Sequence, residues 1–239
     1  MAKAIAGLTR QHASDAVSGL GWRYVFNAAR ANVAVTSLAH AVAVAERAAA
    51  AAGPDADEHL RIDVRRDQVV LSVQTFATGS MTERDVDVVR RITDALSELG
   101  LRTDPNVVTD EATADRASRS VQTLEIAIDA LDIATIRPFW KAVLGYHDET
   151  GSSGPEDPIA DPLGQGPTIW FQQMDAPRPQ RNRIHFDISV PHDEAASRIN
   201  ATIAAGGILR YDAEAPAFWV MADAEGNEIC ICTWQGRDP

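Results

Sequence analysis

Cysteine, aromatic residues and positive charge are all scarce in this chain. It has 239 residues with two cysteines, 6% aromatic residues, and 22 lysines and arginines against 34 aspartates and glutamates, which gives a formal net charge of -12. Cys230 and Cys232 lie two positions apart in an expected strand, so their side chains point to the same side and are poorly placed to form a disulfide with each other. We therefore expect a reducing, cytoplasmic setting.

The scarcity of basic residues and of long apolar runs excludes two classes of partner. An acidic chain without a basic stripe offers no general surface for nucleic acid or for anionic membranes, so neither is expected. No apolar run reaches the roughly 18 residues that cross a bilayer, and the segment after Met1 lacks the apolar core of a secretory signal. Hydrophobic residues still make up 45% of the chain, enough for globular cores, and the length favours two domains.

The first hundred residues predict an α+β domain with elements in the order αββαββα. Three segments show apolar residues at helical spacing, and each begins at a Ser or Thr that can cap a helix. Between them, apolar and polar residues alternate as in half-buried strands. The expected helices span about 9–20, 37–52 and 82–99, and the expected strands lie within 22–35 and at 60–64 and 68–75.

The second half contains an internal repeat of the form βαβββ. One copy starts with the strand Leu124–Asp129 and the other with the strand Ile184–Val190, so that Glu125 and His185 occupy equivalent places 60 positions apart. Each copy continues into a helix and further strands, the clearest at 168–173, 218–221 and 228–232. Two such units side by side would form a curved sheet around a concave pocket. The polar stretch before them is the expected linker, giving domains at 1–103 and 122–239 and a linker at 104–121.

Several motifs of the first half are similar to those of pterin-4a-carbinolamine dehydratase. They are Gly21-Trp22, the alanine-rich helix, the strand from Ile62 and the helix that opens Met81-Thr-Glu-Arg-Asp85. Members of that family carry a His-His-Pro motif before the first central strand and Thr-Thr-His at the end of the second. Here the matching stretches read Glu58-His59-Leu60 and Gln74-Thr75-Phe76, so one of three histidine positions is kept.

This resemblance implies a hydro-lyase that removes water from a 4a-hydroxytetrahydropterin. His59 would act as general acid or base, Glu58 would replace the lost first histidine, and Asp85 matches the acidic residue that opens the family's last helix. Phe76 cannot transfer a proton. The alternative is that the domain keeps the fold for assembly or ligand binding, with His59 a surface histidine and Asp85 a helix-terminal charge.

Motifs of the second half resemble the glyoxalase-like branch of the vicinal oxygen chelate superfamily. They are Asp132 before the first helix, Phe139-Trp140-Lys-Ala-Val-Leu-Gly145, Asn182-Arg-Ile-His-Phe-Asp187 and Ala222-Asp-Ala-Glu-Gly-Asn-Glu228. In metal-dependent members four side chains converge from both repeats, and by position these would be Glu125, Gln172, His185 and Cys230. Glu228 would be a displaced carboxylate on the same side of its strand as Cys230.

Two interpretations of this second site remain open. Gln172 and Cys230 depart from the usual ligands, which favours a pocket without metal or other cofactor, although a divalent metal ion is the alternative. In the metal-free pocket Glu125, Gln172, His185 and Cys230 would contact an organic ligand, with Trp140 and Trp219 as core or pocket wall.

The sequence therefore predicts a small-molecule lyase or binder, with a pterin or another metabolite as ligand. Alternatives are a non-catalytic protein that sequesters a small molecule in the second domain, with the first domain for assembly, and a metal-dependent glyoxalase-type lyase or dioxygenase. A homodimer is what both resemblances imply.

Overall fold

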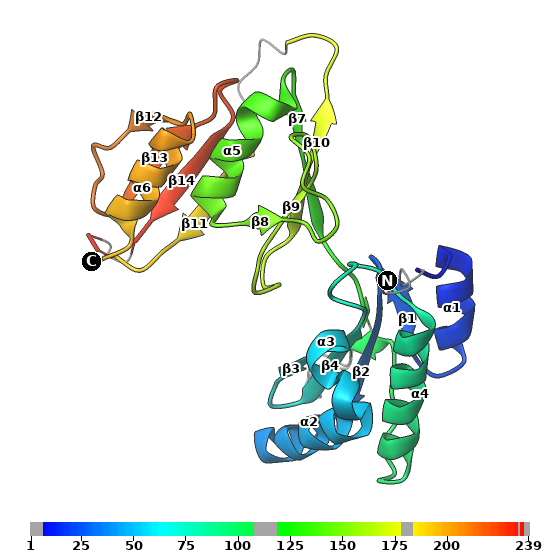
Figure 1. Ribbon diagram of the computed structural model, residues 1–239. Helices are drawn as coiled ribbons and strands as arrows, with labels where there is room; N and C mark the ends of the chain where they lie inside the picture. Colours follow the sequence, from blue (N-terminus) through cyan, green and yellow to red (C-terminus); the bar gives the residue numbers. More distant parts are fainter. Residues whose placement is uncertain (1–6, 108–118, 178–183, 234, 237–239) are drawn as a thin grey trace. The chain divides into compact units, whose positions relative to one another are not determined.

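The chain forms two compact units, Met1–Thr123 and Leu124–Pro239 (Figure 1). The structure, a computed structural model, describes residues 7–107, 119–177, 184–233 and 235–236. Within these residues no helix has the length and apolarity needed to cross a membrane. The first unit holds α1 (Arg10–Ser18), β1 (Arg23–Val25), β2 (Ala28–Ala34), α2 (Leu38–Ala52), a 3-10 turn (Gly53–Asp55), α3 (Ala56–His59), β3 (Leu60–Val64), β4 (Gln68–Val73), α4 (Glu83–Ser97), β5 (Asn106–Val107) and β6 (Arg119–Ser120).

The first unit is an antiparallel sheet with its helices packed on one side, and this confirms the predicted αββαββα order. The strands lie in the order β1-β2-β4-β3. Along β4 the residues Val69, Leu71 and Val73 are buried against the helices, while the residues between them are half-buried on the other side. We call that other side the helix-free face of the first unit.

Helix starts in the first unit follow the predicted caps. Thr9 accepts a hydrogen bond from the backbone N–H of His12, and Ser37 accepts one from that of His40. At α4 the Asp85 carboxylate accepts from the backbone N–H of Thr82 at 2.6 Å, which makes the two residues a capping box.

Part of the predicted linker 104–121 is paired with the first unit. Asp104 forms an antiparallel bridge with Asn32 of β2, and β5 pairs with β6. Residues 108–118 lie outside the described part of the chain.

The second unit contains the two predicted βαβββ repeats, each with its own four-stranded sheet. The first repeat is β7 (Glu125–Ala130), α5 (Ile133–Leu144), β8 (His147–Asp148), β9 (Ile159–Ala160) and β10 (Thr168–Gln173), with strand order β7-β10-β9-β8. The second is β11 (Phe186–Ser189), α6 (Ala195–Ala204), β12 (Ile208–Tyr211), β13 (Phe218–Ala222) and β14 (Glu228–Cys232), with order β11-β14-β13-β12.

The helix α5 packs against both sheets of the second unit. Phe139 and Trp140 share one buried cluster with Ile128 of the first sheet and Ile229 of the second, and the Trp140 ring meets Phe186 edge-on at 6.2 Å. The face of each sheet that lies away from the helices, here called its open face, is therefore turned away from the other sheet. This corrects the expectation of one curved sheet around a shared pocket, because α5 packs between the two sheets.

A tight turn between β13 and β14 holds the two repeats together. The Asp223 carboxylate is fully buried and accepts hydrogen bonds from the Trp140 indole N–H (3.0 Å), from the Asn227 side chain (2.8 Å), and from the backbone N–H groups of Glu225 (3.0 Å) and Asn227 (2.9 Å). Glu225 in turn accepts from the backbone N–H groups of Leu131 and Asp132 at the start of α5. The predicted turn from Asp223 to Asn227 is confirmed, and its hydrogen bonds to Trp140, Leu131 and Asp132 also link the second repeat to the first.

Candidate functional site

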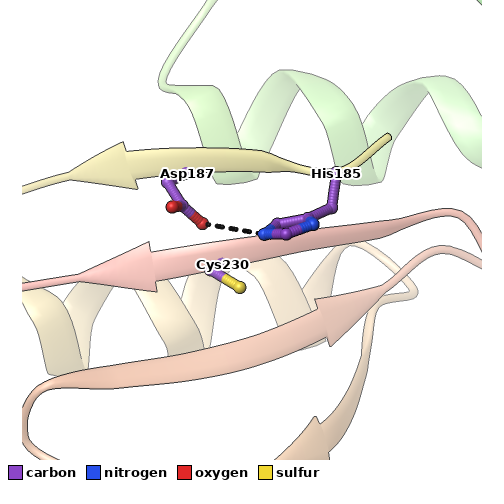
Figure 2. Close-up of side chains that lie close together, drawn as sticks. All are labelled: His185, Asp187 and Cys230. Carbon is purple, nitrogen blue, oxygen red and sulfur yellow. Dashed lines mark ion pairs between the residues drawn. The ribbon is translucent and has the colours of Figure 1, made fainter. Parts of the chain in front are cut away.

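Three side chains meet on the open face of the second repeat: His185, Asp187 and Cys230 (Figure 2). His185 precedes β11 directly, Asp187 is in β11, and Cys230 lies opposite Asp187 in the parallel strand β14. Their potential ligand atoms all lie within 4.8 Å of one another, and His185 Nε2 is 3.7 Å from Asp187 Oδ1. The side chains of His185 and Asp187 are each 59% exposed, so a molecule in solution can reach them.

The cysteine of this cluster is the buried member. Burial raises the pKa of the Cys230 thiol to about 12, and both its hydrogen bond to Asp187 and the charge of that carboxylate act in the same direction. The thiol is therefore protonated at neutral pH and is a poor nucleophile. Glu228 lies two residues earlier on the same face and adds to the negative charge around Cys230.

The other two members of the sequence-predicted ligand set lie elsewhere. Glu125 begins β7, and Gln172 lies in β10 in register with Asp129, so both are exposed on the open face of the first repeat. The structure brings His185 and Cys230 together but does not bring Glu125 or Gln172 to them within one chain. The layer of packed helices separates the two faces.

The two tryptophans expected near a ligand lie on the helix side of the sheets. Trp140 is 1% exposed and its indole N–H is bonded to Asp223, so it belongs to the core. Trp219 packs partly buried against the same core and lies opposite Ile231 rather than Cys230. Both therefore support the sheet from behind, where a ligand on the open face does not reach them.

Asp187 is the member of the cluster that sequence reasoning missed. It follows His185 by two positions in the expected strand Ile184–Val190, and residues two apart in a strand share a face. Strand parity alone could therefore have placed a carboxylate beside His185.

The donor set of the three residues fits a divalent metal ion such as zinc. Imidazole nitrogen, carboxylate oxygen and thiolate sulfur are the ligand types of protein zinc sites, and a site with three protein ligands keeps a fourth position for water or substrate. Bond lengths of about 2.0–2.3 Å place two ligands of one zinc ion roughly 3.5 Å apart. The 3.7 Å between His185 Nε2 and Asp187 Oδ1 is close to that value, all three ligand atoms lie within 4.8 Å of one another, and the exposed His185 and Asp187 side chains can adjust.

In the first unit, His59 is held by Asp85 and Thr75. His59 Nδ1 lies 2.7 Å from Asp85 Oδ1, and the two residues are 4% and 0% exposed. Thr75 Oγ1 donates to Asp85 Oδ2 at 2.8 Å and lies 3.3 Å from His59 Nδ1. A carboxylate bonded to one ring nitrogen fixes the imidazole and leaves Nε2 as its other proton-exchanging atom. No hydrogen bond to His59 Nε2 is made by the described residues.

Glu58 and Phe76 do not join this pair. The Glu58 side chain is exposed, and its backbone carbonyl accepts from the N–H of Phe76. The guanidinium of Arg61 lies over the Phe76 ring, 5.0 Å from the ring centre. Thr75 therefore contacts His59, whereas Phe76 contacts Arg61.

Comparison with known proteins supports a family for the second unit. Residues 125–232, a little under half of the chain, match the family described as a glyoxalase-like domain. No curated protein matches the chain.

Three similar solved structures each cover less than half of this chain. A glyoxalase/bleomycin resistance protein/dioxygenase family enzyme from Burkholderia phytofirmans is 18% identical, covers 46% of this chain and 95% of its own, and has a TM-score of 0.38. A glyoxalase-related enzyme from Fulvimarina pelagi is 19% identical over 47% of this chain and 88% of its own, with a TM-score of 0.39. A transcriptional coactivator/pterin dehydratase from Brucella melitensis is 22% identical over 38% of this chain and 98% of its own, with a TM-score of 0.34. The family match alone identifies residues 125–232 as a glyoxalase-like domain, which supports a role in binding or modifying small molecules.

Proposed function

We propose that the glyoxalase-like domain binds a small oxygenated metabolite on the open face of the second repeat, through a divalent metal ion held by His185, Asp187 and Cys230. The observation that supports this proposal is the meeting of nitrogen, oxygen and sulfur donors within 4.8 Å of one another on an accessible face. The sequence favoured a metal-free pocket because Gln172 and Cys230 depart from the usual ligands. Asp187 changes that balance, since its carboxylate lies beside His185 and Cys230, from which Glu125 is remote.

The residues around the metal position define what the site can do. Zinc, when bound, supplies Lewis-acid polarisation of a substrate oxygen. His185 and Asp187 are exposed enough for a ligand to approach, whereas Cys230 lies at the base of the cluster. Glu228, on the same face, is a carboxylate that can take or return a proton from a bound molecule. These features suit a lyase or isomerase acting on a substrate with neighbouring oxygen atoms.

Metal titration of the full chain tests this proposal. After chelator treatment, the wild type should bind about one equivalent of zinc, and cobalt should give the near-ultraviolet absorption of a thiolate–cobalt bond. Asp187→Asn and Cys230→Ser should each weaken zinc binding at least tenfold, because even partners outside the ligand set affect metal affinity by about 10–100-fold. His147→Ala removes an exposed histidine from the other sheet and serves as the control. Equal zinc affinity in wild type and Cys230→Ser would contradict the ligand assignment.

A second candidate function is hydro-lyase activity of the first unit on a pterin carbinolamine. It is supported by the buried His59–Asp85 pair, in which a carboxylate fixes an imidazole. With Phe76 in place of a proton-transferring histidine, turnover should be slow, since one general acid–base group typically contributes about 10²–10⁴-fold.

Carbinolamine loss followed by ultraviolet absorbance tests this second candidate. His59→Ala should abolish the residual rate, and Phe76→His should raise it. Efficient turnover by the wild type that survives His59→Ala would rule out His59 as the catalytic group. No turnover even in Phe76→His would favour a first unit that serves binding or assembly.

A further inference from the structure

The helix-free face of the first unit gathers polar side chains from neighbouring strands. Arg30 and Asn32 of β2 lie opposite Ser72 and Val70 of β4, and Gln68 of β4 lies opposite Ala34. The residues between them on both strands belong to the core beneath the sheet. These polar side chains therefore point to the same side, away from the helices.

Three of these residues hold buried atoms without hydrogen-bond partners. Within the described residues, five buried side-chain atoms lack a partner, and four of them are Arg30 Nε, Asn32 Nδ2, Asn32 Oδ1 and Gln68 Oε1. Asn32 is only 3% exposed, and neither end of its amide is bonded. Buried polar groups are normally paired, so four such atoms on one face call for a partner that the described residues do not supply.

The same face concentrates positive charge in an acidic chain. Arg23 lies opposite Arg30, Arg30 lies opposite Ser72, and Ser72 lies opposite Arg61, which places three arginines in one row across the sheet. Burial lowers the pKa of the Arg30 guanidinium, and the charge of Arg61 lowers it further. Arg30 makes no ion pair with a carboxylate among the described residues. Arg61, two strands away from Arg30, is the charge that repels it, and a bound anion would offset that repulsion.

We propose that the helix-free face of the first unit binds a small organic anion. A carboxylate or phosphate oxygen of the ligand accepts hydrogen bonds from the Arg30 guanidinium, whose planar fork suits both groups. A neighbouring hydroxyl or amide of the same molecule pairs with the Asn32 amide and donates to Gln68 Oε1. This site lies in the other unit from the proposed metal site and does not depend on it.

Thermal unfolding of the full chain with two probe anions tests this site. Inorganic phosphate and lactate are titrated against chloride at constant ionic strength, and at least one should raise the melting temperature saturably, as a ligand of the folded state does. A response to phosphate alone identifies a phosphate site, and a response to lactate alone identifies a hydroxycarboxylate site.

Three variants and one control locate the binding. Arg30→Gln and Asn32→Leu should each raise the half-saturating concentration at least tenfold. Arg30→Lys keeps the charge and loses the fork, so it remains informative where Arg30→Gln does not fold. Arg66→Gln makes the same charge change at an exposed turn residue and should leave the half-saturating concentration within twofold of wild type. The absence of saturable binding of either anion, or unchanged binding in both Arg30 variants, would overturn the proposal.

Discussion

Removing the Asp223 carboxylate should destabilise the second unit more than any exposed charge there. Asp223→Ala leaves the indole N–H of Trp140 without a partner in the core, and it also removes three bonds within the turn that precedes β14. Glu225 and Asn227, which supply the turn donors, are half-buried residues that water can reach, whereas Trp140 is 1% exposed and cannot be reached.

The size of the effect follows from these contacts. A buried donor left unpaired costs about 1–3 kcal/mol, and a hydrogen bond to a charged group contributes about 1.5–3 kcal/mol. With the turn bonds largely replaced by water, we expect a loss of about 3–4 kcal/mol. For a unit of this size such a loss lowers the melting temperature by on the order of 10–15 °C.

Tryptophan fluorescence reports on this unit, because four of the five tryptophans, all except Trp22, follow residue 124. Asp175→Ala, at an exposed loop position of the same unit, is the matched control and should melt within about 2 °C of wild type. A double-mutant cycle with Trp140→Phe isolates the indole–carboxylate bond. Additive effects of Asp223→Ala and Trp140→Phe, with no coupling between them, would refute the reasoning.

Three further predictions concern other parts of the chain. Burial raises the pKa of Asp55, but two arginines of α4 outweigh this effect and hold the pKa below its usual value. Wild type should therefore have a higher melting temperature than Asp55→Asn at neutral pH. This advantage should be lost as the pH falls below about 4, through the folded-state pKa of Asp55. Gly207→Ala should destabilise the second unit by about 1–3 kcal/mol in chemical denaturation, because the added Cβ would lie 2.6 Å from the Phe139 ring. The control Gly19→Ala should leave the stability unchanged, because its added Cβ meets nothing within 4 Å. The separate piece 124–239 should fold alone, and a circular dichroism spectrum of an unfolded chain would show that the two units depend on each other.

Much of the fold was predictable because local patterns and tertiary packing agree. The caps at Thr9 and Ser37 and the strands 168–173 and 228–232 lie where hydropathy and turn residues placed them. The exposed caps accept hydrogen bonds from the first backbone N–H groups of their helices, and the apolar residues of the strands face the core, so local patterns along the chain were sufficient.

The arrangement of the candidate metal site was harder to predict. Glu125 and His185 hold equivalent places in the repeat, and equivalence along the chain suggested that they converge. How two repeats pack is decided by long-range contacts, here by α5 lying against both sheets with Trp140 on Phe186. No local signal in the sequence carries that choice, whereas the pairing of His185 with Asp187 was available from strand parity alone.

Asp85 imposes a constraint on any attempt to redesign the first unit. One carboxylate both caps α4, through the backbone of Thr82, and holds the ring of His59. A change made to retune the histidine therefore also loosens the start of a helix, and a change made to strengthen the helix also moves the imidazole. The two properties cannot be varied independently through this residue, and Thr75 is no escape, because its hydroxyl bonds the hydroxyl of the N-cap residue Thr82 as well as Asp85 and His59.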